Sequence, residues 1–189
     1  SPGPHDKAQL ELPLGEDFWV FGYGSLMWDP GFPHLEVRLG MLYGFHRHLC
    51  IYSHIYRGTP ERPGLVFGLD RGGSCRGLVY RVPAAEGEAV IDYLMEREMV
   101  TKVYRPRWAK VHTQEGPVTA ATFTVDGGHK QYAGRLSDAE LVEHILQGRG
   151  SSGSALEYLE KTVHHMDALG IGDPPLKRLL RLVHARLGG

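Results

Sequence analysis

With 189 residues, the chain is long enough to bury the core of one ordinary domain without disulfide bonds or bound metal, so we look for a single active site. Lysine and arginine number 21 against 22 for aspartate and glutamate, which gives a net charge of -1 at pH 7. With so little net charge, the protein has no positive electrostatic potential that would attract phosphate groups or an anionic membrane. We therefore expect neither a nucleic acid nor a membrane as a partner.

The cysteines and histidines narrow the chemistry further. Cys50 and Cys75 are too few for a disulfide framework and lack the C-x-x-C spacing of a zinc or redox motif, which favours two reduced thiols in a cytoplasmic protein. The 11 histidines contain no H-E-x-x-H or H-x-x-x-H spacing. We therefore expect no metal site and no cofactor.

The N-terminal segment is polar and rich in turn-forming residues, and it contains no apolar stretch of the kind found in signal peptides. We expect residues 1–16 to be a disordered leader or an expression remnant and residues 17–189 to form the domain. No later apolar stretch is long enough to span a bilayer.

Strands dominate the first two thirds of the chain. Phe18-Trp19-Val20-Phe21 is an aromatic and β-branched run that ends at Gly22, which is typical of a buried strand entering a tight loop. The segment from 57 to 64 is dense in glycine and proline and indicates a turn. The predicted strands are residues 18–21, 40–53, 64–69, 75–82, 103–111 and 120–125.

Helices follow, and most lie late in the chain. The first is predicted over residues 84–98. Ser137 with Glu140 forms a capping-box pattern that opens a helix ending at Gly148, and Ser154 with Glu157 repeats the pattern for a helix ending near Gly170. A last helix starts at Asp173, with proline just inside it. Strands first and helices later predict an α+β fold rather than a doubly wound sheet.

The helix over residues 84–98 separates two nearby glutamates. Val90, Ile91, Leu94 and Met95 form one apolar stripe, and Glu98 continues it at i+8 from Val90, whereas Glu96 belongs to a polar side. A carboxylate at the inward end of an apolar stripe either finds donors or has a raised pKa, which suits a general base. The alternative is a helix frayed by residue 97, with Glu98 in a solvated loop.

A glycine loop follows the first strand. Gly22-Tyr23-Gly24-Ser25-Leu26-Met27 lets the backbone approach a ligand, and successive N–H groups can bind an oxyanion or a carboxylate. It lacks the spacing of a dinucleotide fingerprint and of the G-x-S-x-G nucleophile elbow, so a purely structural turn stays open as the alternative. A true G-x-G-x-x-G at residues 148–153 is a decoy, because it joins two predicted helices instead of following a strand.

Several separated motifs occur in order along the chain, at residues 21–26, 30–33, 53 with 57–60, 77–81, 93–98, 131–134 and 153–159. Together they resemble one family, the ChaC-like glutathione-specific γ-glutamylcyclotransferases. The resemblance runs from about Phe18 to near the end of the chain, with the motifs in the expected order. It departs after Glu98, where many relatives have a glycine pair before a tyrosine, and at Tyr56, where several have histidine.

The resemblance implies a single α+β domain, with a mixed β-barrel-like core, flanking helices and a cavity at one end. It also implies a lyase of glutathione catabolism that converts glutathione to 5-oxoproline and L-cysteinylglycine, by attack of the substrate's own amine on its γ-carbonyl. Glu98 matches the catalytic glutamate, Gly22 to Met27 match the substrate-binding loop, and Tyr132 matches a pocket tyrosine. Arg57 is our candidate partner for a substrate carboxylate, with a solvated loop arginine as the alternative.

Three other functions remain open from the sequence. The chain could act on other γ-glutamyl dipeptides or amines, or it could be a non-catalytic regulatory binding module. A serine hydrolase using Ser25 is the third, although its nucleophile elbow is missing.

Chelators should leave activity unchanged, because the histidines lack ligand spacing and the cyclisation needs no Lewis acid. The measurement is turnover before and after treatment with a strong chelator. Loss of turnover that added zinc restores would contradict this prediction.

Overall fold

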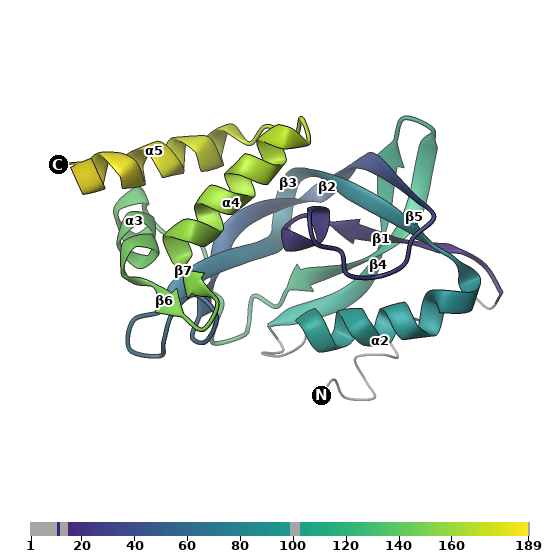
Figure 1. Cartoon of the computed structure of the whole chain (residues 1–189), viewed down its shortest axis with the longest axis horizontal. Helices are drawn as coiled ribbons and strands as arrows, with labels where there is room; N and C mark the ends of the chain where they lie inside the picture. Colours follow the sequence, from purple (N-terminus) through teal and green to yellow (C-terminus); the bar gives the residue numbers. More distant parts are fainter. Residues whose placement is uncertain (1–10, 12–14, 99–102, 189) are drawn as a thin grey trace. The chain divides into compact units, whose positions relative to one another are not determined.

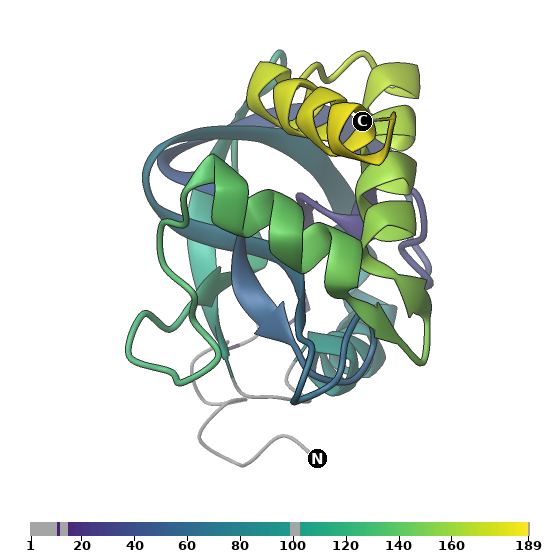
Figure 2. The ribbon, with the colours of Figure 1, turned by 90° about the vertical axis from the view of Figure 1, so that its left-hand side faces the viewer.

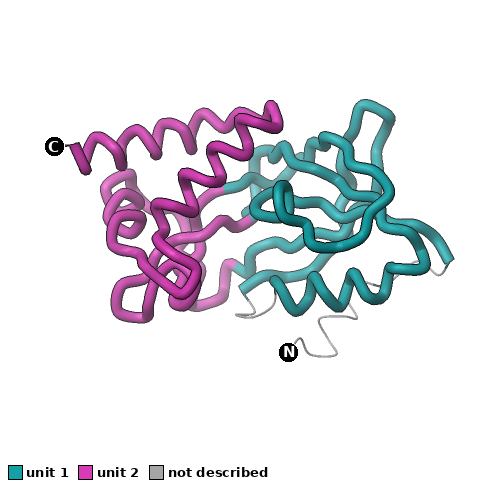
Figure 3. The backbone as a smooth tube through the Cα atoms, viewed as in Figure 1, with its two compact units in different colours: residues 1–47, 69–126 teal, residues 48–68, 127–189 magenta. Residues whose placement is uncertain are grey.

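The computed structural model describes residues 11, 15–98 and 103–188, so most of the predicted leader lies outside the described residues. Backbone contacts divide the chain into two compact units (Figure 3). The first consists of Ser1–Arg47 and Leu69–Asp126, and the second of His48–Gly68 and Gly127–Gly189.

Five strands close into a barrel in the order β1-β3-β2-β4-β5 (Figure 1). β1 pairs with β3 in antiparallel and with β5 in parallel orientation, and β4 pairs antiparallel with both β2 and β5. The barrel is therefore mixed, and the predicted α+β class is confirmed. The strands are β1 (Phe18–Gly22), β2 (Glu36–Ser53), β3 (Gly64–Val82), β4 (Tyr104–Thr113) and β5 (Gly116–Val125).

A single strand, β3, replaces the two predicted at residues 64–69 and 75–82. The glycines between them, Gly72 and Gly73, have φ of 102° and 68°. Because glycine adopts this left-handed region without steric cost, the strand continues through a segment that reads as a turn in the sequence. β2 also begins four residues earlier than predicted, at Glu36.

Helix α2 (Gly87–Glu98) runs beside the barrel in the first unit, after the short 3₁₀ helix η2 (Ala84–Glu86) (Figure 1). Together these two elements span the predicted helix over residues 84–98. The apolar stripe of α2 is buried as predicted, with each of its four side chains at most 4% exposed. At the start of α2, the Phe18 ring lies against Gly87 and meets the Trp108 ring edge-on at 5.8 Å.

The second unit contains three helices that contact one another (Figure 2). The predicted capping box is confirmed, since the Ser137 hydroxyl accepts from the Glu140 amide and the Glu140 carboxylate accepts from the Ser137 amide. No helix among the described residues is long and apolar enough to cross a membrane. The helices are α3 (Asp138–Gln147), α4 (Ala155–Ala168) and α5 (Pro174–Gly188).

The G-x-G-x-x-G segment forms a small hairpin, β6 (Arg149–Gly150) with β7 (Gly153–Ser154), between α3 and α4. A Cβ at Gly148 would lie 2.5 Å from the Arg57 carbonyl oxygen, and one at Gly150 would lie 2.3 Å from the Ile55 carbonyl oxygen. These glycines allow two backbone segments to touch, so the interpretation of the motif as a decoy is confirmed.

Candidate functional site

Glu98 is the last residue of α2, and its side chain is only 19% exposed. Glu96, two residues earlier on the same helix, is exposed. The separation predicted from the helical period is therefore confirmed, and the alternative of a helix frayed by residue 97 is wrong.

Burial raises the pKa of Glu98 from the ordinary 4.5 to about 7. The guanidinium of Arg97 opposes this rise, with its Nε 3.9 Å from Glu98 Oε1. A carboxyl group whose pKa lies near neutrality can accept a proton and return it within one reaction at physiological pH.

The glycine loop joins β1 to the 3₁₀ helix η1 (Ser25–Met27). Gly22 is required by the fold, because a Cβ there would lie 2.8 Å from Leu26 Cβ. Gly24 differs, since a Cβ there would meet nothing within 4 Å and the space beside it is open. Within the described part of the chain, the amides of Ser25 and Leu26 donate to no protein acceptor. The loop thus offers free N–H groups at its start, as the first turn of a helix does.

Two buried side chains hold the carbonyl groups of this loop. Tyr80 on β3 donates to the Leu26 carbonyl at 2.6 Å, and burial raises the pKa of this phenol to about 12, so it remains a donor. Arg47 on β2 is only 9% exposed, and its Nε donates to the Tyr23 carbonyl at 2.5 Å. With both carbonyls bound, the loop backbone is fixed on either side of Gly24.

Arg97 connects the end of α2 to the same loop. Its Nη2 donates to the Ser25 hydroxyl at 2.7 Å, and its Nη1 donates to the Asp29 carbonyl at 2.7 Å and to the Pro30 carbonyl at 3.4 Å. Nη1 also lies 2.9 Å from the Tyr93 hydroxyl, one turn earlier on α2.

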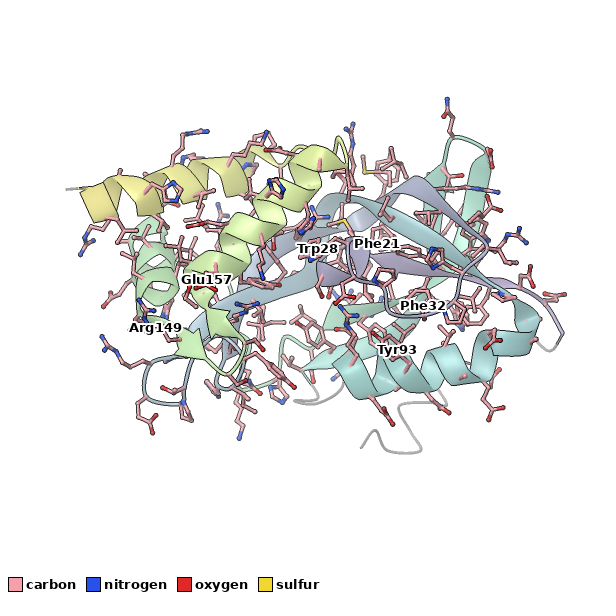
Figure 4. All side chains as sticks on the ribbon, viewed as in Figure 1. Phe21, Trp28, Phe32, Tyr93, Arg149 and Glu157 are labelled. Carbon is pink, nitrogen blue, oxygen red and sulfur yellow. The ribbon has the colours of Figure 1, made fainter. Side chains whose placement is uncertain are left out.

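Gly31 allows the segment after the glycine loop, residues 28–32, to approach α2. Gly31 has a φ of 71°, and a Cβ there would lie 2.2 Å from the Tyr93 hydroxyl oxygen. Figure 4 shows Tyr93 beside Phe32, whose ring centroid is 6.3 Å from that of Tyr93. Segment 28–32 is therefore fitted closely to α2, where Arg97 and Glu98 lie.

Arg57 belongs to the second unit and is half-buried there. Its guanidinium lies 5.3 Å from the centre of the Tyr158 ring, and its Nη1 donates to the Ser154 carbonyl at 3.1 Å. The alternative of a solvated loop arginine is wrong for this reason. A role toward a substrate carboxylate stays a prediction.

Tyr132 also lies in the second unit, directly after the buried Gln131. It forms an isolated antiparallel bridge with Ile51, and the next amide, that of Ala133, donates to the Cys50 carbonyl at 2.6 Å. This short segment extends the pairing of β2, which fixes the backbone of Tyr132. Its role in a pocket stays a prediction.

Residues 18–186 match the family model described as ChaC-like protein. The chain belongs to the ChaC-like family. It is 34% identical over 163 residues to an Escherichia coli protein named glutathione-specific gamma-glutamylcyclotransferase, across 86% of this chain and 71% of that protein. A human relative, glutathione-specific gamma-glutamylcyclotransferase 1, is 30% identical over 177 residues, across 90% of this chain and 80% of its own.

A solved structure bears out the fold of this ChaC-like chain. The crystal structure of a yeast gamma-glutamyl cyclotransferase specific to glutathione superposes with a TM-score of 0.81, at 22% identity, across 89% of this chain and 96% of that one. The predicted barrel with flanking helices is therefore confirmed.

Sequence reasoning missed the residues that support the loop. Arg47 stands between His46 and His48 in the sequence, so nothing in the local pattern indicates that its side chain is buried. Arg97 precedes Glu98 directly, but its partners at residues 25, 29 and 30 are distant in sequence. Tyr80 gives no comparable signal, since tyrosine is common in strands.

The raised pKa of Glu98 predicts a pH-dependent gain in stability for Glu98→Gln. Between pH 4.5 and about 7 the folded state holds a proton that the unfolded state has lost, so wild-type stability falls as pH rises through this window. At pH 8 the neutral glutamine avoids this cost, and Glu98→Gln should be more stable than wild type by up to about 3 kcal/mol. Below pH 4.5 the difference should vanish.

The measurement is urea unfolding at pH 4 and pH 8. Glu96→Gln is the matched control on the exposed side of α2 and should show no such gain. Equal stability of Glu98→Gln and wild type at pH 8 would contradict the prediction.

Proposed function

We propose that this chain is a glutathione-specific γ-glutamylcyclotransferase, which cleaves glutathione into 5-oxoproline and L-cysteinylglycine. The observation that carries the proposal is a largely buried carboxyl group, Glu98, with a pKa of about 7, in a ChaC-like chain with the glycine loop after β1. The names of the E. coli and human relatives support glutathione as the substrate.

In the proposed reaction, Glu98 takes a proton from the α-ammonium group of the γ-glutamyl residue. The freed amine attacks the γ-carbonyl carbon, and the new C–N bond closes the five-membered lactam. The attacking nitrogen gives up a second proton as it becomes the lactam N–H. Collapse of the tetrahedral intermediate breaks the bond to the cysteine nitrogen. Glu98 returns the first proton to this leaving amine, which takes up the second proton by way of water. The reaction consumes no water, so the enzyme is a lyase.

We propose that the loop from Gly22 to Met27 holds the γ-glutamyl unit in its folded, reactive shape. The open space beside Gly24 and the free amides of Ser25 and Leu26 support this role. These N–H groups suit either the α-carboxylate or the oxyanion that forms on the γ-carbonyl. Holding the amine close to the carbonyl also removes much of the entropic barrier to closure.

We also propose that two residues of the second unit, Arg57 and Tyr132, contribute to substrate binding. The bond to the Ser154 carbonyl uses one of the five N–H groups of the Arg57 guanidinium, so others can face a substrate carboxylate. Stacking on Tyr158 would hold the guanidinium plane while it binds.

The first experiment is incubation with glutathione, followed by mass detection of 5-oxoproline. γ-Glutamyl dipeptides and amines are assayed in parallel, and turnover of these in preference to glutathione would identify a broader cyclotransferase. Binding of glutathione without 5-oxoproline would favour the regulatory binding module.

Glu98→Gln should lower kcat on the order of 10²–10⁴-fold, because it keeps size and polarity but removes the base. Glutathione binding, measured by calorimetry, should survive. Glu96→Gln is the control and should retain wild-type turnover, since its side chain faces water. The assignment is wrong if Glu98→Gln turns over glutathione at a near wild-type rate, or if Glu96→Gln is the variant that loses activity while folded.

Ser25→Ala should keep substantial activity, because the loop contributes its backbone amides and the serine hydroxyl accepts a bond from Arg97. Arg97 retains its carbonyl partners in this variant. A loss as large as that of Glu98→Gln would return the serine nucleophile to contention, and labelling by a serine-reactive phosphonate would then test it directly.

A further inference from the structure

We propose that Arg97 is the positioning residue of this site: its guanidinium fastens the end of α2, which carries Glu98, to the glycine loop and the segment after it. The inference rests on the proposed function in one respect, the role of Glu98 as the base. It assigns to Arg97 a task that neither the loop nor Glu98 can perform alone.

The need for such a fastening follows from the position of Glu98. It is the last residue of α2, and the final turn of a helix leaves its carbonyl groups without intrahelical partners and tends to fray. A base in a fraying turn would not stay within reach of one substrate nitrogen, and a misplacement of about 1 Å can cost a hundredfold in rate. Arg97 is the adjacent residue, so fixing it also fixes the backbone of Glu98.

The bonds of Arg97 reach the loop at two separate places. One is the hydroxyl of Ser25, at the start of η1, and the other is the pair of carbonyls at Asp29 and Pro30. These residues flank the rest of η1, whose first amides we propose as the substrate-binding donors. The base and the donors are therefore held by one side chain.

Arginine is suited to this task and lysine is not. The guanidinium is planar and presents its N–H groups in a fixed fork, so Nη1 and Nη2 can bind different oxygens at the same time. The ammonium of lysine is a single point of charge and could satisfy only part of this set. The contact with the Tyr93 hydroxyl restricts the guanidinium further, because Gly31 leaves that hydroxyl little room to move.

Arg97 also sets the charge environment of Glu98. It is the charged group that acts on Glu98 within the described residues, and it lowers a pKa that burial raises. The other titratable groups beside Arg97 are Tyr93 on α2 and Tyr80 on β3. Neither of these two groups is a source of the shift in the pKa of Glu98.

The test compares Arg97→Lys with Arg97→Gln, using kcat, KM and the pH dependence of kcat/KM for glutathione. Arg97→Lys keeps the positive charge but loses the forked N–H groups of the guanidinium, so kcat should fall at least about tenfold. Because the charge is kept, the acidic limb of the pH profile should stay near that of wild type. Arg97→Gln loses both, so kcat should fall as well and the acidic limb should move to higher pH. Arg178→Gln, which removes an exposed arginine paired with Asp138 in the second unit, is the control and should match wild type.

Carbon-13 NMR titration of the Glu98 carboxyl supplies a second measurement that needs no turnover. The titration midpoint should rise in Arg97→Gln and stay close to wild type in Arg97→Lys. If wild type forms no 5-oxoproline, the proposed function fails, but this titration still tests the contact between Arg97 and Glu98.

Three results would overturn the proposal. Full activity in Arg97→Lys would show that the charge alone suffices and that the fork positions nothing. An unchanged titration midpoint in Arg97→Gln would show that Arg97 does not govern the carboxyl group. A lowered melting temperature with an unchanged pH profile and unchanged kcat would also reject it, because Arg97 would then serve stability alone.

Discussion

The carboxyl group of Glu98 lies where water solvates it poorly, so its ionisation costs free energy. The other features of the site depend on this placement, because they fix the end of α2 and the loop beside it. The apolar stripe of α2 is buried in the first unit, and Glu98, which continues this stripe, is buried with it. A carboxyl group in such surroundings resists ionisation until the pH approaches about 7. The same burial that weakens the fold at neutral pH gives this carboxyl group the basicity that the proposed role as general base requires.

Buried side chains also fix the glycine loop. They donate to its carbonyl oxygens and leave the amides of Ser25 and Leu26 without protein acceptors among the described residues. Tyr80 stays protonated because its pKa is about 12, and Arg47 keeps its charge while nine tenths of its surface is buried. A buried arginine is costly unless its N–H groups are bonded, and the carbonyls of Tyr23 and Arg76 meet that need. These bonds fix the shape of the loop, so the proposed binding of substrate would impose little further ordering on it.

The sequence predicted those features that depend on local periodicity. The helical period separated Glu98 from Glu96, and the capping box located the start of α3, because both signals lie within a few residues. Contacts between distant segments were not predictable. The partners of Arg97 in residues 25–30 lie 67 to 72 positions away, and Arg57 packs on Tyr158 about a hundred positions along the chain. The prediction of two strands in place of β3 was wrong for another reason. A pair of glycines such as Gly72 and Gly73 usually interrupts a strand, and only the pairing of the whole strand shows that β3 continues through them.

The distance between Arg97 and Glu98 explains how a guanidinium and a carboxyl group with a raised pKa can lie side by side. A short, hydrogen-bonded ion pair would stabilise the ionised carboxylate and hold the pKa of Glu98 well below neutrality. At 3.9 Å the Nε is close enough to moderate the effect of burial but too far for a hydrogen bond. Nη1 and Nη2 are instead directed at the Ser25 hydroxyl and at carbonyl oxygens, which are neutral acceptors. The bonds to the loop therefore keep the guanidinium from pairing closely with Glu98, so the pKa of this carboxyl group stays raised.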